Sequence, residues 1–380
     1  MAKAKRKSNY YDITIIGSGL SNLIIAERFR RRGLKVALIT EDHVLGDRYR
    51  YFVEGDTFFP QCLNFFPTSE SSIDAQLEEF TNLWLEKIES STSSRGQVTF
   101  DSGRIQEFLG FGENKPQTID AIDPYLRHKE FIDFNMNPSQ WIHRLENCDL
   151  GDVFFRQVVT KFEIEDKRIV GFTLNGAKKY TTAAVVYGGS LRDMKRLLDA
   201  DTVGARTLTK LSKTPTWVGV HLFLKHSKQI TEATDLHILR GSKTEPCLGQ
   251  FSVTQSARGE DQYFSQWMTF ISAEMAEDNE LTGQALREIK KQIKRAYPEA
   301  IDAIEFERIY VEQVLSMDPS GATTDGQLKA VENLWLTGPG FHPEGFLVGD
   351  ILWADHQWLK IIDELQPSDS HMSLETEAQA

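Results

Sequence analysis

The segment from Tyr11 to Glu41 constrains the fold of this chain more than any other. A short, β-branched apolar run, Ile13–Ile16, precedes a glycine turn at residues 17–19, and apolar residues at helical spacing follow the turn. Gly33 ends the predicted helix, and Val36–Ile39 forms a second buried strand. Strand, glycine turn, helix and strand in this order predict a βαβ unit of a dinucleotide-binding fold. In such a unit a phosphate binds the free N–H groups at the helix N-terminus.

The middle of the chain is predicted to contain many short strands and several helices. Short predicted strands fill residues 152–189, and Asn175-Gly176 between alternating segments predicts a hairpin. Further strands are expected at residues 216–224, 251–254, 262–271 and 309–315. Helices are expected at residues 69–87, from Pro138, at residues 191–198 and at residues 281–297, whereas residues 109–127 are expected to be loops. A length of 380 residues exceeds what one compact core usually holds, so we expect two domains.

The segment Asn333–Lys360 repeats the plan of the opening unit. Leu334–Leu336 is a predicted strand, residues 338–340 are a glycine turn, and a helix is expected from Gly345 onward. The chain after Leu365 is polar and acidic, which is typical of a disordered tail.

Composition and charge exclude several classes of protein. A formal charge of -12 argues against non-specific nucleic-acid binding, and no apolar run approaches the roughly 18 residues of a transmembrane segment. The basic start, MAKAKRKSN, lacks the apolar segment of a secretory signal. Cys62, Cys148 and Cys247 lie far apart without a CxxC pair, which indicates a reducing compartment. We therefore predict a cytoplasmic protein that acts on a small molecule, and no metal site, since the histidines include no HExxH motif.

Several parts of the sequence together resemble one superfamily, that of the FAD-dependent amine oxidases, protoporphyrinogen oxidases, phytoene desaturases and UDP-galactopyranose mutases. The matching parts are the opening unit, the loop Gly46-Asp47-Arg48, the β segment around residues 155–190, and residues 333–360. The resemblance implies an α/β fold with a Rossmann-like FAD/NAD(P)-binding domain and a discontinuous second α+β substrate domain. The first domain is expected at residues 10–70, 140–213 and 315–365, the second at 71–139 and 214–314, and disordered tails at 1–9 and 366–380.

The resemblance also implies which residues bind FAD. The opening turn would hold the pyrophosphate, the loop at residues 46–48 would lie near the ribityl phosphate, and a backbone group near Val159 would contact the adenine. The N–H groups at the start of the last helix would face the flavin ring and stabilise its reduced form. The expected cofactor-binding residues are Gly17, Ser18, Gly19, Leu20, Ser21, Asn22, Thr40, Glu41, Gly46, Asp47, Arg48, Val159, Gly188, Gly338, Pro339, Gly345, Phe346 and Leu347.

His342 is the candidate catalytic residue, because its loop is expected to face the flavin ring. The alternative is a loop histidine bonded to a backbone carbonyl. Other candidates for the substrate pocket are Phe58, Phe59, Trp217, His221, Trp267 and Phe341. His221 alternates with apolar neighbours in a predicted strand, which favours a structural role for it.

Four positions depart from the pattern of the superfamily. Asn22 replaces the third turn glycine, and Asp47 replaces the middle glycine of a Gly-Gly-Arg loop. Thr40, with Glu41 next to it, stands where an acidic residue binds the ribose, and Pro339 replaces an aspartate.

Two functions therefore stay open. One is an FAD-dependent oxidoreductase of the amine oxidase or desaturase type, which transfers a hydride from a small or apolar substrate to flavin. The other is a degenerate binding protein with a protein or lipid partner, as in Rab GDP-dissociation inhibitor, which shares the fold without flavin catalysis. We favour the oxidoreductase because the other motif residues keep the family spacing; NAD(P) is a lesser option.

Overall fold

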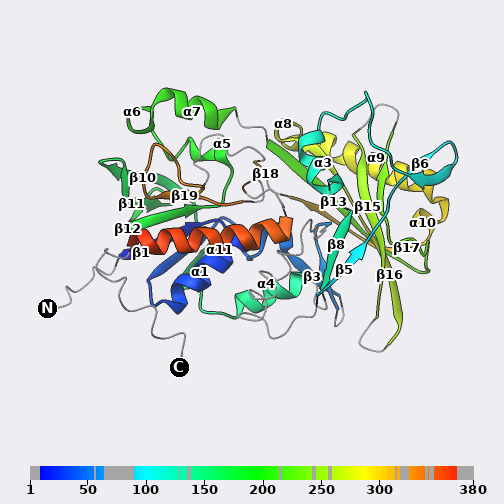
Figure 1. Cartoon of the computed structure of the whole chain (residues 1–380), viewed down its shortest axis with the longest axis horizontal. Coiled ribbons are helices and arrows are strands. Elements are labelled where there is room, and N and C mark those ends of the chain that lie inside the picture. Colours follow the sequence, from blue (N-terminus) through cyan, green and yellow to red (C-terminus); the bar gives the residue numbers. More distant parts are fainter. Residues whose placement is uncertain are drawn as a thin grey trace.

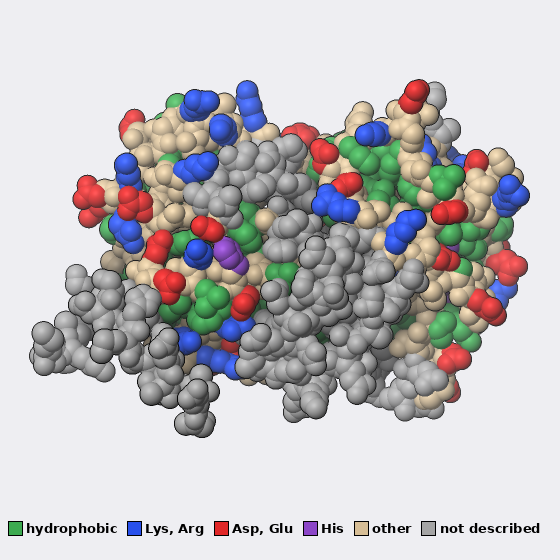
Figure 2. All heavy atoms as spheres, in the orientation of Figure 1, with side chains coloured by type: hydrophobic (Ala, Val, Ile, Leu, Met, Phe, Trp, Pro, Cys, Tyr) green, Lys and Arg blue, Asp and Glu red, His purple; other side chains and the backbone are tan. Residues whose placement is uncertain are grey.

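The protein has a mixed α/β fold built on two large sheets (Figure 1). The computed structural model describes residues 9–54, 57–63, 90–127, 129–134, 138–213, 216–241, 245–255, 259–312, 315–316, 325–338, 341 and 346–365. Within these residues, no helix is both long and apolar enough to cross a lipid bilayer. Acidic and basic side chains are interspersed on the face seen in Figure 2.

The first sheet contains five parallel strands. Their order is β9 (Asp152–Phe155), β2 (Val36–Thr40), β1 (Tyr10–Ile16), β12 (Lys178–Tyr187) and β19 (Leu334–Leu336). The first half of β12 also continues an antiparallel meander with β10 (Val159–Glu165) and β11 (Arg168–Leu174). The strand order therefore changes direction at β1, because the chain adds β2 on one side of it and β12 on the other.

Side chains alternate between the two faces of this sheet. Leu38 of β2 packs with α1 (Leu20–Arg31), α4 (Pro138–Glu146) and α11 (Phe346–Leu365) in one core. Its neighbour Ile39 packs in a second core that includes residues of β10 and β11. This second core also receives residues of the short helices α5 (Leu191–Met194), α6 (Ala200–Val203) and α7 (Ala205–Ser212). Burial on both faces explains why β1 and β2 consist mainly of apolar residues.

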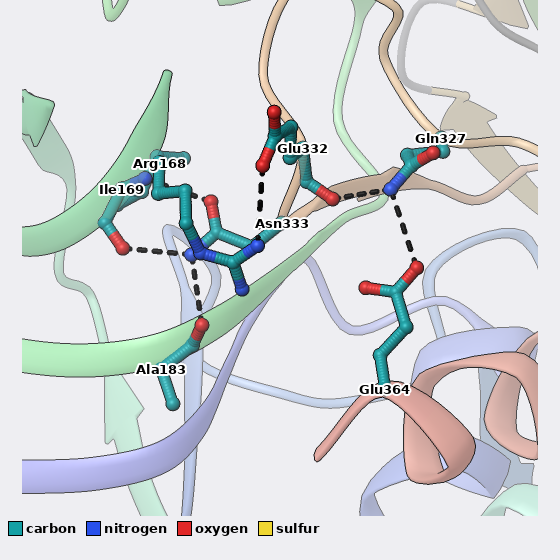
Figure 3. Close-up of polar contacts among 7 residues, drawn as sticks. All are labelled: Arg168, Ile169, Ala183, Gln327, Glu332, Asn333 and Glu364. Atoms are coloured by element: carbon teal, nitrogen blue, oxygen red, sulfur yellow. Dashed lines mark hydrogen bonds and ion pairs between the residues drawn. The ribbon is translucent and has the colours of Figure 1, made fainter. Parts of the chain in front are cut away.

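Asn333 fixes the closing segment to this sheet (Figure 3). Its side-chain oxygen accepts a hydrogen bond from Ile169 N at 2.7 Å. Its Nδ2 donates to the carbonyls of Ile169 and Ala183, each at 2.8 Å. The amide thus bridges β11 and β12 immediately before β19, and Gln327 adds bonds to Glu332 O and Glu364.

The second sheet is mainly antiparallel. Its order is β17 (Ile304–Val311), β13 (Thr216–His226), β16 (Asp261–Ser272), β15 (Cys247–Gln255), β14 (Leu236–Leu239), β6 (Gln97–Asp101) and β7 (Arg104–Glu107), and β18 (Leu315–Ser316) pairs with β13. Residues of α9 (Asn279–Ala296) and α10 (Pro298–Asp302) join one of its cores, and residues of α3 (Ile119–Leu126) join another. The remaining elements are η1 (Asp47–Tyr49), α8 (Ala273–Ala276) and the two-stranded pairs β3 (Tyr51–Glu54) with β4 (Thr57–Pro60) and β5 (Ser90–Ser94) with β8 (Glu130–Phe134).

Several predicted elements differ from the structure. Residues 109–127 were expected to be loops but contain α3, whose start is fixed by the distant Glu245: its carboxylate accepts bonds from the N–H groups of Gln117 and Thr118. The helix expected at residues 191–198 ends at Met194. The chain after Met194 forms turns instead, in one of which Leu197 N donates a hydrogen bond to Met194 O. The strand expected at residues 309–315 is wrong in its limits, and β17 ends at Val311. The helix expected at residues 69–87 lies outside the described residues.

Candidate functional site

A cavity of about 500 Å³ lies at the carboxyl ends of the parallel strands. Ile16 of β1, Ile39 of β2 and Tyr187 of β12 all line it. In open α/β sheets, ligands bind at this edge where the strand order changes direction. Of the expected cofactor residues, those that line the cavity are Gly17, Ser18, Thr40, Glu41, Asp47, Val159 and Gly188.

The glycine turn closes tightly on the neighbouring strand. Gly17 has a φ of +103°, and a Cβ there would lie 3.3 Å from the carbonyl carbon and oxygen of Gly188. Gly17 N donates to Ile39 O, and Gly188 N donates to Ile16 O, both at 2.8 Å. Gly19 is the N-cap of α1 and has no side-chain capping bond, so the first turn of α1 presents backbone N–H groups.

Asn22 uses the space that a third turn glycine would leave open. Its Oδ1 accepts a hydrogen bond from Thr337 Oγ1 at 2.7 Å, and its Nδ2 donates to Ile16 O at 3.3 Å. A Cβ on Gly188 would overlap Asn22 Nδ2. The residue that must be small at this contact is Gly188, immediately after β12, and Asn22 joins α1 to the ends of β1 and β19.

Thr40 and Glu41 have different surroundings at the end of β2. Thr40 is buried; its hydroxyl donates to Ser18 Oγ at 3.2 Å and accepts from Asp42 N at 3.2 Å. Glu41 is exposed, and both residues line the cavity. Desolvation of its carboxyl by the surrounding protein atoms, followed by repulsion from Asp193 and Asp42, raises the pKa of Glu41.

The loop Gly46-Asp47-Arg48 is docked on the turn, because Gly46 N donates to Ser18 O at 2.9 Å. Gly46 and Asp47 both have left-handed backbones, with φ of +100° and +47°. The Asp47 Oδ2 lies 3.8 Å from where a Cβ on Gly19 would be. Its Oδ1 is buried and has no hydrogen-bond partner in the part of the chain that the structure describes. Burial, and then repulsion from Glu312, raises the pKa of Asp47 to about 6.

Arg48 points into a buried polar network. Its Nη2 donates to Tyr125 OH at 2.8 Å, and its Nε lies 3.3 Å from Glu312 Oε1. The Glu312 Oε2 lies 3.0 Å from His221 Nε2. Since His221 Nδ1 accepts from Leu63 N at 3.2 Å, its Nε2 carries the proton and donates to Glu312.

Glu312 is 1% exposed, yet it belongs to the lining of the cavity. Burial alone would raise the pKa of Glu312, but Arg48 and His221 outweigh that effect and hold the pKa below its ordinary value. The inner end of the cavity therefore carries a charged carboxylate, whereas Arg48 is not among the lining residues.

Cys62, His221 and Glu312 have ligand atoms within 4.8 Å of one another, as a metal site would require. Both nitrogens of His221 are already hydrogen-bonded, and Arg48 balances the charge of Glu312. Burial, and then Glu312, raises the pKa of Cys62 well above its usual value, which disfavours the thiolate that metals bind. The donor set thus suits a hydrogen-bonded ion pair better than a metal ion.

Asp350 of α11 was not identified from the sequence. It accepts hydrogen bonds from Ser21 Oγ of α1 and from Tyr49 OH of η1, each at 2.8 Å. Glu312 and Tyr125 were also not identified from the sequence. Each is a single polar residue that distant elements bring to the site, and no local spacing marks it.

The other candidates are dispersed. His342, Pro339 and Gly345 lie outside the described residues, as does the side chain of Phe58. Gly338, with a φ of +146°, follows β19, and Phe346 and Leu347 begin α11. Phe59 and Trp267 belong to hydrophobic cores, Trp217 packs against another, and Phe341 stacks on Trp353 at 5.5 Å.

The sequence matches no protein-family model and no curated protein. Solved structures share the fold at low identity. An oxidoreductase from Methanosarcina mazei aligns with a TM-score of 0.64 and 12% identity over 92% of this chain and 99% of its own. Cyclohexylamine oxidase from Brevibacterium oxydans aligns with a TM-score of 0.64 and 11% identity, over 94% and 100%. Putrescine oxidase with bound putrescine aligns with a TM-score of 0.60 and 12% identity, over 93% and 99%.

Proposed function

We propose that the cavity binds FAD and that the protein is a flavin-dependent oxidoreductase. The observation that carries the proposal is the closure of the Gly17 turn on Gly188 beside the uncapped start of α1. That arrangement brings backbone N–H groups and a positive helix end to the cavity, which suits a diphosphate. The shared fold with oxidoreductases, over nearly the whole chain, supports the same function.

The proposed FAD/NAD(P)-binding domain is Rossmann-like and contains the parallel sheet, with limits at residues 10–70, 140–213 and 315–365. Apart from β18, the second sheet belongs to the proposed substrate domain, residues 71–139 and 214–314. In this proposal the N–H groups of residues 18–21 bind the diphosphate, Glu41 binds a ribose hydroxyl, and the segment at Val159 contacts the adenine.

Bound FAD would supply the hydride acceptor for a small substrate. The chain itself provides a charged hydrogen-bond acceptor at the inner end of the cavity. There Glu312 stays ionised beside Arg48 and can accept a hydrogen bond from a ligand O–H or N–H group. The cavity lies between the two sheets, since Val218 and Val311 of the second sheet also line it. His342 remains the proposed catalytic residue.

A second function is favoured by the position of Asp47. Its carboxylate lies next to the start of α1, where a diphosphate would bring further negative charge. A binding protein that has lost flavin chemistry would tolerate this residue. The cavity would then hold a ligand without a diphosphate.

The experiment is to purify the full chain, soak it in FAD, remove free ligand and record the flavin absorbance. The oxidoreductase predicts retained flavin, and Gly19→Trp should abolish retention, because its side chain would enter the space beside Asp47. Gly283→Trp, in α9 and outside the lining of the cavity, is the control, because a Cβ there would approach the flexible side chain of Arg287. If the wild-type chain is folded and retains no flavin, the proposal is wrong.

A further inference from the structure

Asp47 keeps the backbone of a glycine and adds a carboxylate. Left-handed backbone is easy for glycine and tolerable for aspartate, whose short side chain bonds locally. Gly46 and Asp47 are both left-handed, with Gly46 tied to the turn through Ser18 O. The backbone at Asp47 is therefore one that glycine also adopts readily, and the aspartate places one additional charge at the cavity.

That charge lies where the cavity meets the start of α1. The Asp47 Oδ2 is 3.8 Å from the Cβ position of Gly19, the N-cap residue. No acidic residue occurs in the first turn of α1. The Asp47 carboxylate thus lies next to the positive end of α1. A ligand diphosphate would bind the N–H groups at that same helix end.

The cations near Asp47 are engaged by other carboxylates. Arg50 forms an ion pair with Asp42, and Arg48 forms one with Glu312. Three carboxylates (Asp42, Asp47 and Glu312) thus face two guanidinium groups, which leaves one negative charge in excess. The titratable and charged groups around Asp47 are Asp42 after β2, Arg48 and Arg50 of the loop, Cys62, and Tyr310 and Glu312 at β17.

We propose that Asp47 sets the dinucleotide affinity of this cavity, so that FAD binds with the uptake of one proton by the Asp47 carboxyl. This inference rests on the proposed function, because it assumes that the diphosphate occupies the start of α1. A carboxylate and a diphosphate repel each other when both are desolvated at a helix end. Protonation of Asp47 removes the carboxylate charge, so the diphosphate can bind the helix end without this repulsion.

The size of the effect follows from linkage. The free protein holds Asp47 with a pKa of about 6. If binding requires the protonated form, the dissociation constant rises tenfold for each pH unit above that value. Between pH 5 and pH 8 the loss of affinity approaches about 100-fold.

The test is calorimetric titration of the full, cofactor-free chain with FAD at pH 5 and pH 8, in buffers that differ in ionisation enthalpy. The wild-type chain should take up close to one proton per FAD at pH 8 and bind about 100-fold more weakly there than at pH 5. Asp47→Asn and Asp47→Gly should take up none and should bind FAD at pH 8 as the wild type does at pH 5. Riboflavin, which lacks the diphosphate, should show no such dependence.

Asp166→Asn is a matched control, because Asp166 also has a left-handed backbone, with φ of +45°, but lies in an exposed turn. It should behave as the wild type. Equal FAD affinity and equal proton uptake in the wild type and Asp47→Asn would overturn the role of Asp47. Absence of FAD binding to every folded variant at both pH values would instead overturn the proposed function, and the inference with it.

Discussion

The contact between Asn22 and Gly188 predicts that alanine or glycine in place of Asn22 would destabilise the protein. Asn22 accepts a bond from Thr337 Oγ1 at 2.7 Å and donates to Ile16 O at 3.3 Å, all within a buried site. Replacement by alanine loses these bonds and leaves the Thr337 hydroxyl unsatisfied. A net hydrogen bond contributes about 0.5–1.5 kcal/mol and a buried unsatisfied group costs about 1–3 kcal/mol. We expect Asn22→Ala to lower the free energy of unfolding by about 2 kcal/mol, and Asn22→Gly by about 1 kcal/mol more, because glycine disfavours the helix.

Gly188→Ala supplies the second side of a double-mutant cycle. Its Cβ would overlap Asn22 Nδ2 and lie 2.9 Å from Thr337 Oγ1. Overpacking of this kind costs about 1–3 kcal/mol. In the double variant Asn22→Ala/Gly188→Ala the amide is gone and the new methyl occupies its space. The double variant should therefore be more stable than the sum of the single changes by about 1–2 kcal/mol.

The assay is urea unfolding followed by circular dichroism, with hydrogen exchange of the α1 amides as a local measurement. Asn147→Ala provides the control, because the exposed side chain of Asn147 donates a hydrogen bond to His143 O just after α4. Its change should be small, and its coupling to Gly188→Ala should be zero within error. Strict additivity of Asn22→Ala and Gly188→Ala, or a gain in stability with Asn22→Gly, would refute the packing argument.

Three further predictions concern the acidic groups and thiols. Because the pKa of Asp47 is raised from 3.8 to about 6, ionisation of its carboxyl destabilises the fold. The Asp47→Asn variant should therefore be more stable than the wild type by up to about 3 kcal/mol above pH 6, and this difference should vanish near pH 3.5. A stability difference that does not depend on pH in an unfolding series would contradict this. Glu312→Gln leaves Arg48 buried without its counter-ion and should cost about 3–5 kcal/mol in urea unfolding, whereas Glu307→Gln at an exposed ion pair should cost under about 1 kcal/mol; equal losses would argue against the buried network. Cys62 and Cys247 are buried with raised pKa values, so a thiol reagent at pH 8 should label the native chain once, at Cys148, and labelling of Cys62 without unfolding would show that the network opens.

Local signals predicted the parallel sheet well. The apolar run of β1, the glycine turn and the periodic face of α1 depend on neighbours in sequence, and the structure contains all three. The closing strand and α11 repeat the same local pattern and are confirmed as elements. In the structure β19 pairs with β12, which lies next to β1.

The polar interior of the site could not be predicted in the same way. The four residues of this network come from segments separated by tens of residues, and only the fold brings them together. They are Arg48, Tyr125, His221 and Glu312. The sequence resemblance implies a phosphate ligand role for Arg48, whereas the structure shows its guanidinium in an ion pair with Glu312. The resemblance identified Asp47 as unusual, but only the left-handed backbone and the neighbouring Gly19 show where its carboxylate lies.

The dependence of α1 on α11 has a consequence for synthesis on the ribosome. Leu23 and Ile24 of α1 share a core with Ile351 and Ala354 of α11, which lies at the end of the described chain. At about 5–20 residues per second, on the order of 15–65 s separate the two helices during translation. The nascent chain must shield the apolar face of α1 for that interval, so premature termination before α11 should yield aggregated chains rather than a smaller soluble product.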